Sequence, residues 1–362
     1  MIYRVRQCRS GFPLTHTLSS LKLLCSNPFT LIDIGCSKGI ESYWRSLGDA
    51  FRAYCVDVDE MEILRLREME THPYIKYYCK PIGLPREHPM VISRSGRGPL
   101  SNNPWSRLST AWGAEIISPA SVAGTAGTSN LPLPISISDF AMKEGVDDID
   151  FIKIDIDGDD YCALLSCDDL IARHDILGFH LEVNFFGSID ETDNTFHNTD
   201  RFMRSRGYQL FDLSTRRYSR RDLPSPFVIR GLSPTRWGAV VQGDALYVKD
   251  KAVEVDATAT APNKILKLAA VFEIFGLADC AAEILNLHRN RLSSIVDIDN
   301  LLNLLTPLLN GKKVSYQEYL SEFSKDVSAF NRKPLDMFTD KAYSLIKCII
   351  TGIANRYSSR LY

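Results

Sequence analysis

Long apolar runs are absent from this sequence, and their absence argues against a membrane-spanning protein. No stretch of its 362 residues approaches about 18 consecutive apolar residues, which is the length that a membrane span requires. The first residues, 1–18, also lack the continuous apolar core of a secretory signal peptide. We therefore expect neither a membrane span nor a secretory leader.

Positive charge and paired cysteines are also scarce. The chain has 42 Lys and Arg against 44 Asp and Glu, which gives a net charge of −2. A nucleic-acid binder would be expected to carry a strong basic excess, so we expect no nucleic-acid partner. No CxxC pair occurs among the nine cysteines, and this favours reduced thiols over a disulfide framework. We therefore expect a cytoplasmic protein.

The composition is that of a globular chain, with 45% hydrophobic and 24% charged residues. Seven short, mostly apolar runs alternate with helical patterns, and this alternation indicates an α/β fold with a mostly parallel sheet. The last two runs have no helical pattern between them, which allows an antiparallel edge hairpin. The runs cover residues 30–34, 51–58, 75–79, 150–156, 176–186, 208–213 and 245–249, and the helical patterns cover 40–47, 59–70, 137–144, 159–171 and 195–206.

Two regions interrupt this alternation. The insertion at residues 84–134 is rich in Ser, Gly and Pro and carries Trp105, Arg107 and Trp112. A loop of this length is usually functional or disordered, so it is either a lid over a substrate or a mobile surface insertion. Beyond residue 251 the sequence predicts an all-helical C-terminal region, which we interpret as a packing or oligomerisation unit. The predicted domains are therefore an N-terminal segment at 1–29 packed on the core, an α/β domain at 30–250, and the helical region at 251–362.

A glycine turn follows the first predicted strand, in the motif from Asp33 to Gly39. Its glycines allow a sharp turn and a close approach of the backbone to a ligand. The motif fits neither the GxGxxG of a dinucleotide site nor the GxxxxGK[ST] of a phosphate loop. S-adenosylmethionine carries no phosphate but has a sulfonium and an ammonium group, so the acidic Asp33 suits it. An ordinary strand-to-helix turn is the alternative.

A second acidic position is Asp57, which ends the second predicted strand and lies 57 − 33 = 24 residues after Asp33. An acid at this place can accept hydrogen bonds from ribose hydroxyls. With Asp59 it also forms a DxD pair, which is typical of a metal-dependent glycosyltransferase. That interpretation leaves the glycine turn unexplained, and Asp59 is also suited to be a helix N-cap.

Four aspartates crowd the end of the fourth predicted strand, namely Asp155, Asp157, Asp159 and Asp160. Ligands of open parallel sheets bind at the carboxyl ends of the strands. The cluster could bind a divalent cation, but it lacks the distal glutamate of a calcium loop. Asp159 and Asp160 are also well placed to cap the next helix.

These motifs resemble those of the FkbM-type methyltransferases, which depend on S-adenosylmethionine. The resemblance rests on LIDIGCSKG at 31–39, on Asp57, on the segment 135–160 with KIDIDGDD, and on FHLEVN at 179–184. It implies a Rossmann-like class I methyltransferase fold over residues 30–250, and O-methylation of a hydroxyl on a sugar, glycan, polysaccharide or related secondary metabolite. Asp57 and Asp157 stand where the family commonly has glutamate. The resemblance implies a cofactor site made of Asp33, Gly35, Ser37, Gly39, Asp57 and Asp155.

Methylation of a hydroxyl needs a group that removes the proton. Asp155, His180 and Glu182 lie at the ends of neighbouring predicted strands, and His197 follows the fifth. We favour Glu182, because a carboxylate inside an apolar strand is costly unless it is paired or functional, with Asn184 on the same face to orient the acceptor. His180 is more simply explained as a hydrogen-bonded core histidine.

No metal is expected to be required, and Asp155 and Asp157 are the ligands if one is. The run 216–221, RRYSRR, either recognises an anionic substrate or forms a solvated basic edge. The expected partners are a small-molecule or glycan substrate and, through the C-terminal helices, a second copy of the chain. The competing hypotheses are the glycosyltransferase and a catalytically inactive binding protein on the same fold.

Overall fold

The computed structural model describes residues 11–95, 107–108, 133–156, 160–228, 234–253, 260–309 and 311–330. The chain divides into two compact units, Met1–Ile298 and Asp299–Tyr362. The first unit holds the sheet and the helices that pack on it. The proposed domain boundaries at residues 29/30 and 250/251 stay predictions.

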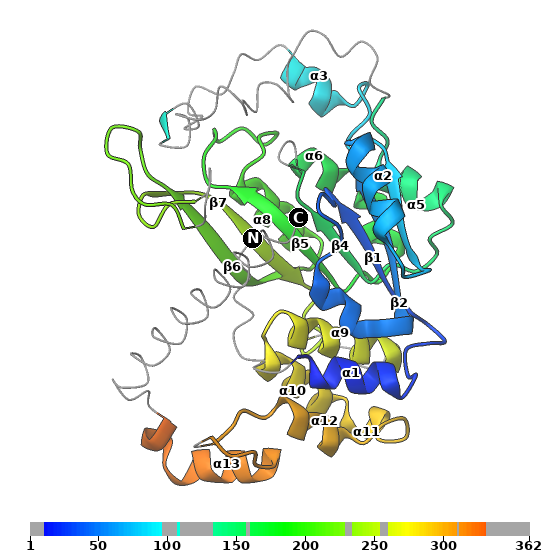
Figure 1. Ribbon diagram of the computed structural model, residues 1–362, viewed down its shortest axis with the longest axis vertical. Helices are drawn as coiled ribbons and strands as arrows, with labels where there is room; N and C mark the ends of the chain where they lie inside the picture. Colours follow the sequence, from blue (N-terminus) through cyan, green and yellow to red (C-terminus); the bar gives the residue numbers. More distant parts are fainter. Residues whose placement is uncertain are drawn as a thin grey trace, which may run out of the picture. The chain divides into compact units, whose positions relative to one another are not determined.

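A seven-stranded sheet forms the centre of the first unit, with the strand order β3-β2-β1-β4-β5-β7-β6 (Figure 1). Strands β1 to β5 are parallel, whereas β7 runs antiparallel to both β5 and β6. This confirms the predicted α/β fold with its antiparallel edge hairpin. The strands are β1 (Phe29–Ile34), β2 (Phe51–Asp57), β3 (Ile75–Cys79), β4 (Phe151–Ile154), β5 (Gly178–Asn184), β6 (Gln209–Tyr218) and β7 (Ala239–Val248).

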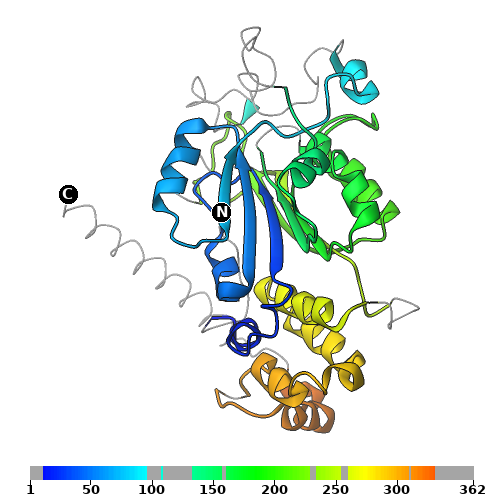
Figure 2. The same cartoon turned by 90° about the vertical axis from the view of Figure 1, so that its right-hand side faces the viewer.

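Helices cover both faces of the sheet, with α2 on one side and α5 to α8 on the other (Figure 2). Ile152, Ile154 and Phe179 belong to one core cluster with residues of α5 to α8. The helix predicted over 159–171 is two helices, α6 and α7, because the Ser166 hydroxyl and the Cys167 thiol hydrogen-bond to the carbonyls that end α6. The elements are η1 (Ser42–Ala50), α2 (Glu60–Met69), α3 (Pro89–Ser95), α5 (Ile137–Lys143), α6 (Asp160–Leu165), α7 (Asp168–Arg173) and α8 (Phe196–Ser205).

The amino-terminal half of the other sheet face carries an aromatic cluster. Trp44 stacks on Phe29 and Phe51 with ring centroids 5.2 and 6.3 Å apart. Phe275, directly after helix α9 (Pro262–Ile274), stacks on Phe151 at 5.6 Å. Large aromatic side chains bury much apolar area, so this cluster anchors α9 and η1 against the sheet. The carboxyl ends of the strands, at the opposite end of the sheet, are left for polar groups.

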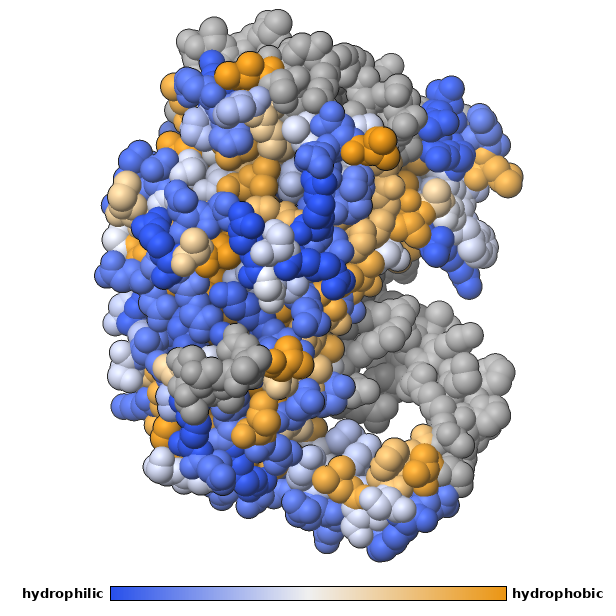
Figure 3. Space-filling view, turned by 180° about the vertical axis from the view of Figure 1, so that it is seen from behind, coloured by the Kyte–Doolittle hydropathy of each residue, from blue (hydrophilic) through white to orange (hydrophobic). Residues whose placement is uncertain are grey.

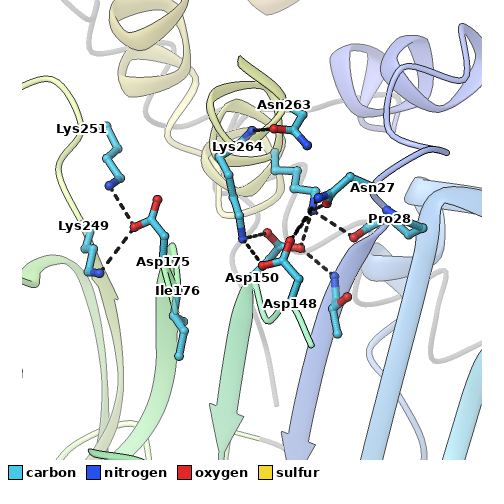
Figure 4. Close-up of polar contacts among 12 residues, drawn as sticks. Asn27, Pro28, Asp148, Asp150, Asp175, Ile176, Lys249, Lys251, Asn263 and Lys264 are labelled. Atoms are coloured by element: carbon cyan, nitrogen blue, oxygen red, sulfur yellow. Dashed lines mark hydrogen bonds and ion pairs between the residues drawn. The ribbon is translucent and has the colours of Figure 1, made fainter. Parts of the chain in front are cut away.

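Two buried lysines of α9 hold that helix at the amino-terminal end of β4 (Figure 4). The Asp150 carboxylate accepts hydrogen bonds from Lys264 Nζ at 2.6 Å and from Lys267 Nζ at 2.7 Å. Asp150 and Lys267 are completely buried, and the Thr30 amide also donates to Asp150. A buried charge is tolerated when it is paired and hydrogen-bonded. This network therefore makes α9 part of the same unit as the sheet.

The N-terminal helix α1 (Pro13–Ser20) is held by the same helix. The Glu273 carboxylate accepts hydrogen bonds from the amides of Leu14 and Thr15, at 2.9 and 2.8 Å. The first amides of a helix lack partners within it, so a glutamate from α9 supplies the missing acceptor. Helix α1 is thereby fixed to α9.

The helices that follow confirm the predicted helical C-terminal region. They are α10 (Ala278–Leu287), α11 (Arg289–Leu292), α12 (Ile298–Leu305), α13 (Tyr316–Lys325) and η4 (Val327–Phe330). Ser315 and Glu318 form a capping box at the start of α13. Residues 331–362 of the predicted helical region lie outside the described residues, and self-association through this region stays a prediction.

The surface of the described residues is mainly polar. On the face shown in Figure 3, hydrophilic residues predominate and hydrophobic ones form smaller patches between them. None of the helices in the described ranges is both long enough and apolar enough to cross a membrane.

Candidate functional site

The carboxyl ends of the parallel strands gather charged side chains on one face of the sheet. Residues paired across neighbouring strands point to the same face. Asp33 of β1 pairs with Lys153 of β4, and Lys153 pairs with His180 of β5. Two residues further along β5, Glu182 pairs with Asp244 of β7. Charges from four strands therefore share the face opposite to α5–α8.

The turn after β1 requires glycine at position 35. Gly35 has φ +83°, and a Cβ there would lie 1.8 Å from the carbonyl oxygen of Asp155. The Gly35 amide donates to the Val56 carbonyl at 2.8 Å, and so ties the turn to β2. Gly39 also has positive φ, and Ser37 between the two glycines is exposed. The glycine turn thus lies directly against the chain that leaves β4.

Lys153 is a charged centre that the sequence analysis missed. Its Nζ donates to the Gly35 carbonyl at 2.9 Å and lies 3.1 Å from Asp33 Oδ1 and 3.8 Å from Asp155 Oδ2. Burial lowers the pKa of Lys153, but the carboxylates of Asp33 and Asp155 outweigh this and raise its pKa above the usual value. Burial also raises the pKa of Asp33, which the nearby lysine partly offsets. The presence of a lysine within the apolar run 150–156 is the sequence feature that could have revealed this charged centre.

Asp57 and Asp59 have different roles at the end of β2. Asp57 is half-buried, and one of its carboxylate oxygens accepts a hydrogen bond from the Asp59 amide at 3.0 Å. The Asp59 carboxylate accepts from the Glu62 amide at 3.1 Å and is the N-cap of α2. The structure thus bears out the N-cap interpretation of Asp59. Of these two aspartates, Asp57 is therefore the one whose carboxylate is placed to bind a ligand.

Glu182 forms the centre of a buried group of charges with Arg216 and Asp244. The Arg216 guanidinium donates to Glu182 Oε1 at 2.5 Å and, through its other terminal nitrogen, to Asp244. Glu182 is 3% exposed and Asp244 7%. Burial, followed by the carboxylates of Asp160 and Asp155, raises the pKa of Glu182 to about 9, although Arg216 acts in the opposite direction.

Asp160 and Asn184 complete the polar part of this edge. Asp160 accepts from the Ile156 amide at 2.9 Å and from the Asn194 side chain at 3.3 Å, and burial raises its pKa to about 7. It therefore holds the loop after β4 to the loop after β5. The buried Asn184 Oδ1, at the end of β5, accepts no hydrogen bond from the described part of the chain.

The two histidines proposed as bases have less suitable surroundings. The ring of His180 lies 5.4 Å from that of Phe275, and burial, followed by the charge of Lys153, lowers its pKa to about 3. His180 is thus neutral and packed in the aromatic cluster, which favours the structural interpretation. His197 is exposed on α8, whose Met203 packs in the core on the opposite face of the sheet.

Some of the predicted site residues lie outside the described residues. These are Asp157 and Asp159 of the acidic cluster, and Trp105 and Trp112 of the insertion. In the ranges that the structure does describe, no group of three or more His, Cys, Asp or Glu side chains is arranged to hold a metal ion. Within the insertion, Leu108 is buried and bridges Arg220 beyond the end of β6.

The comparisons with known proteins agree with the predicted resemblance. Residues 101–210 match the model of the methyltransferase FkbM domain, which confirms it. No curated protein matches. Solved structures that are similar include magnesium protoporphyrin IX methyltransferase from Synechocystis with bound SAM (9% identity, TM-score 0.29, covering 68% of this chain and 88% of that one). Another is TrmK of M. capricolum with S-adenosyl-homocysteine (10%, TM-score 0.27, 84% and 94%). Identities and TM-scores are low, so the family model is what identifies the domain.

Proposed function

We propose that this chain, whose S-adenosylmethionine-dependent methyltransferase domain is of the FkbM type, methylates a hydroxyl group of a sugar, a glycan or a related secondary metabolite in the cytoplasm. The observation that carries the proposal is the buried Glu182 carboxyl. Glu182 lies on the same sheet face as Asp33 of β1 and Lys153 of β4. The carboxyl ends of β1 and β4 meet at the glycine turn. A proton acceptor and a cofactor turn thus occupy one edge of the sheet.

The residues of this edge fit adenosylmethionine. At Gly35 a side chain would collide with the Asp155 carbonyl, so glycine lets the turn pack directly against the backbone after β4 and brings Asp33 and Asp155 together. Asp57 presents a half-buried carboxylate at the end of β2, where ribose hydroxyls are bound in related sheets. Asp33 and Asp155 carry two carboxylates against the single ammonium of Lys153, and the remaining negative charge suits a cationic ligand. Ser37 and Gly39 belong to the same turn. When bound, the cofactor supplies a methyl group on a positively charged sulfur, which is a good leaving group.

We assign Glu182 as the base that accepts the proton of the acceptor hydroxyl. With adenosylmethionine bound, the Glu182 carboxylate would take up the proton of the acceptor hydroxyl as that hydroxyl is methylated. A carboxyl with a raised pKa is a stronger base once it is ionised, and a nearby cationic ligand favours its ionised form. Asp155 is the neighbouring acid that helps to position the reactants.

Arg216, Asp244 and Asn184 orient this base and the acceptor. The Arg216 guanidinium holds the carboxylates of Glu182 and Asp244 side by side, which fixes the side-chain rotamer of Glu182. Asn184 ends the same strand on the same face, with a buried side-chain oxygen that accepts no hydrogen bond from the described residues. A donor from the ligand, such as a hydroxyl next to the one that is methylated, would satisfy it.

The experiment that tests this function uses adenosylmethionine with an isotopically labelled methyl group. The full-length protein is incubated with it and with separate panels of sugars, sugar phosphates, oligosaccharides and hydroxylated secondary metabolites, and also with amine and thiol acceptors. Transfer of label to a hydroxyl acceptor, as a methyl ether, is the expected result. Transfer only to nitrogen or sulfur would contradict O-methylation, and label in none of the panels would contradict the proposed acceptor class.

The glycosyltransferase alternative is disfavoured by Asp59. A DxD pair holds a metal ion through both carboxylates, whereas the Asp59 carboxylate caps α2. The matched domain is a methyltransferase domain, and both observations favour methyl transfer.

A further inference from the structure

Positive charge collects where the chain passes from β6 to β7. Arg217, Arg220, Arg221 and Arg236 are all exposed there. Asp222 is the only acidic residue between positions 217 and 238. Strand β6 also contains Arg216, whose half-buried guanidinium is paired with Glu182 and so does not contribute to this surface. Four exposed arginines against one aspartate thus give this connection a net positive charge.

The described parts of this connection, residues 219–228 and 234–238, form an ordered structure. Segment 225–228 runs antiparallel to 234–237, because Phe227 bridges Thr235 and the Val228 amide donates to the Pro234 carbonyl at 2.8 Å. Thr235 is buried, and its amide donates to the Arg217 carbonyl at 2.7 Å. The backbone of the connection is therefore fixed to the end of β6.

Large apolar side chains are exposed on the same connection. Leu223 is 83% exposed, Trp237 59% and Val228 54%. The Arg236 guanidinium lies 5.2 Å from the centroid of the Trp237 ring, so charge and apolar surface are adjacent. Exposed apolar residues surrounded by arginines are unfavourable in water and suit a partner that is both anionic and apolar. A soluble anion would account for the arginines but not for Leu223 and Trp237.

We propose that this arginine–apolar patch (Arg217, Arg220, Arg221, Leu223, Arg236 and Trp237) attaches the protein peripherally to an anionic lipid bilayer. Arginines near an anionic surface are attracted to its lipid head groups. Leucine and tryptophan side chains enter the boundary between head groups and acyl chains, where an indole ring is well accommodated. The attachment requires no membrane-spanning helix, and it does not depend on methyl transfer.

Sedimentation of the full-length protein with lipid vesicles tests this proposal. We expect binding to vesicles of phosphatidylcholine and phosphatidylglycerol in equal parts, weak binding to phosphatidylcholine alone, and loss of binding at high salt. Arg220→Ala with Arg221→Ala should weaken binding by about 25-fold, because each arginine contributes about five-fold. The matched control is Lys76→Ala with Lys143→Ala, which removes two exposed cations of the same unit, one of them on β3 at the opposite edge of the sheet, and should leave binding unchanged.

Trp237→Ala separates a bilayer from a soluble polyanion. It should weaken vesicle binding several-fold while leaving retention on a heparin column unchanged, because only the bilayer has an apolar phase to receive the ring. Circular dichroism shows whether each variant is folded. The proposal is overturned if the wild-type protein fails to bind the anionic vesicles, if it binds heparin or single-stranded RNA but not vesicles, or if folded Trp237→Ala binds vesicles as well as the wild type.

Discussion

Replacing Asp57 by alanine should weaken adenosylmethionine binding without unfolding the domain. One Asp57 oxygen is occupied by the Asp59 amide at 3.0 Å, and the carboxylate is half-buried at the end of β2. A hydrogen bond to a charged group contributes roughly 1.5–3 kcal/mol, so its loss corresponds to about one to two decades in the dissociation constant. Isothermal titration calorimetry on the purified variant measures this change.

The neighbouring Asp59→Ala variant is the matched control. Asp59 caps α2 through the Glu62 amide, and loss of an N-cap costs about 0.5–2 kcal/mol of unfolding free energy. We therefore expect Asp59→Ala to lower the midpoint of thermal unfolding and to leave cofactor affinity unchanged. Unchanged affinity in a folded Asp57→Ala variant would remove Asp57 from the ribose site. Equal losses of affinity in both variants would attribute the effect to a disturbed turn between β2 and α2 and not to the Asp57 carboxylate.

Three further variants or conditions test the rest of the account. Glu182→Gln should lower turnover by roughly 10²–10⁴-fold with cofactor affinity nearly intact. Because the Glu182 carboxyl, with its pKa of about 9, must be ionised to act as a base, wild-type kcat/KM should rise with pH up to about 9. The variant should lack this rise. A chelator should leave turnover unchanged; loss restored by magnesium would make Asp155 and Asp157 metal ligands. Asp150→Ala should lower the unfolding free energy by about 3–5 kcal/mol in thermal or denaturant unfolding, because it leaves the fully buried Lys267 without its carboxylate partner; a stability loss below about 1 kcal/mol would contradict this.

The strands and the glycine turn could be predicted because their signals are local. Apolar runs alternate with helices along the chain, and β3 (Ile75–Cys79) has the predicted bounds. Gly35 directly follows β1 and Asp57 ends β2, so their places at the carboxyl edge of the sheet follow from the topology. The cap on α2 by Asp59 is equally local, since donor and acceptor are three residues apart.

The partners of the buried charges could not be predicted, because they come from distant parts of the chain. The run at 216–221 suggested a surface feature, yet Arg216 reaches Glu182, which lies 34 residues earlier. His180 was weighed as a base, and its aromatic neighbour Phe275 follows α9. Lys267 and Asp150 are 117 residues apart, although they form one buried pair. A charge pattern in sequence gives the type of side chain but not which opposite charge the fold brings to it.

The central claim is that this protein binds adenosylmethionine at the edge formed by the glycine turn and Asp57. The most direct test is calorimetric titration of the wild-type protein with S-adenosylmethionine and with S-adenosylhomocysteine, beside a nucleotide sugar with manganese. The account predicts saturable binding of the first two ligands and none of the nucleotide sugar. A folded protein that binds neither adenosylmethionine nor adenosylhomocysteine, or that binds the nucleotide sugar with manganese instead, would contradict it.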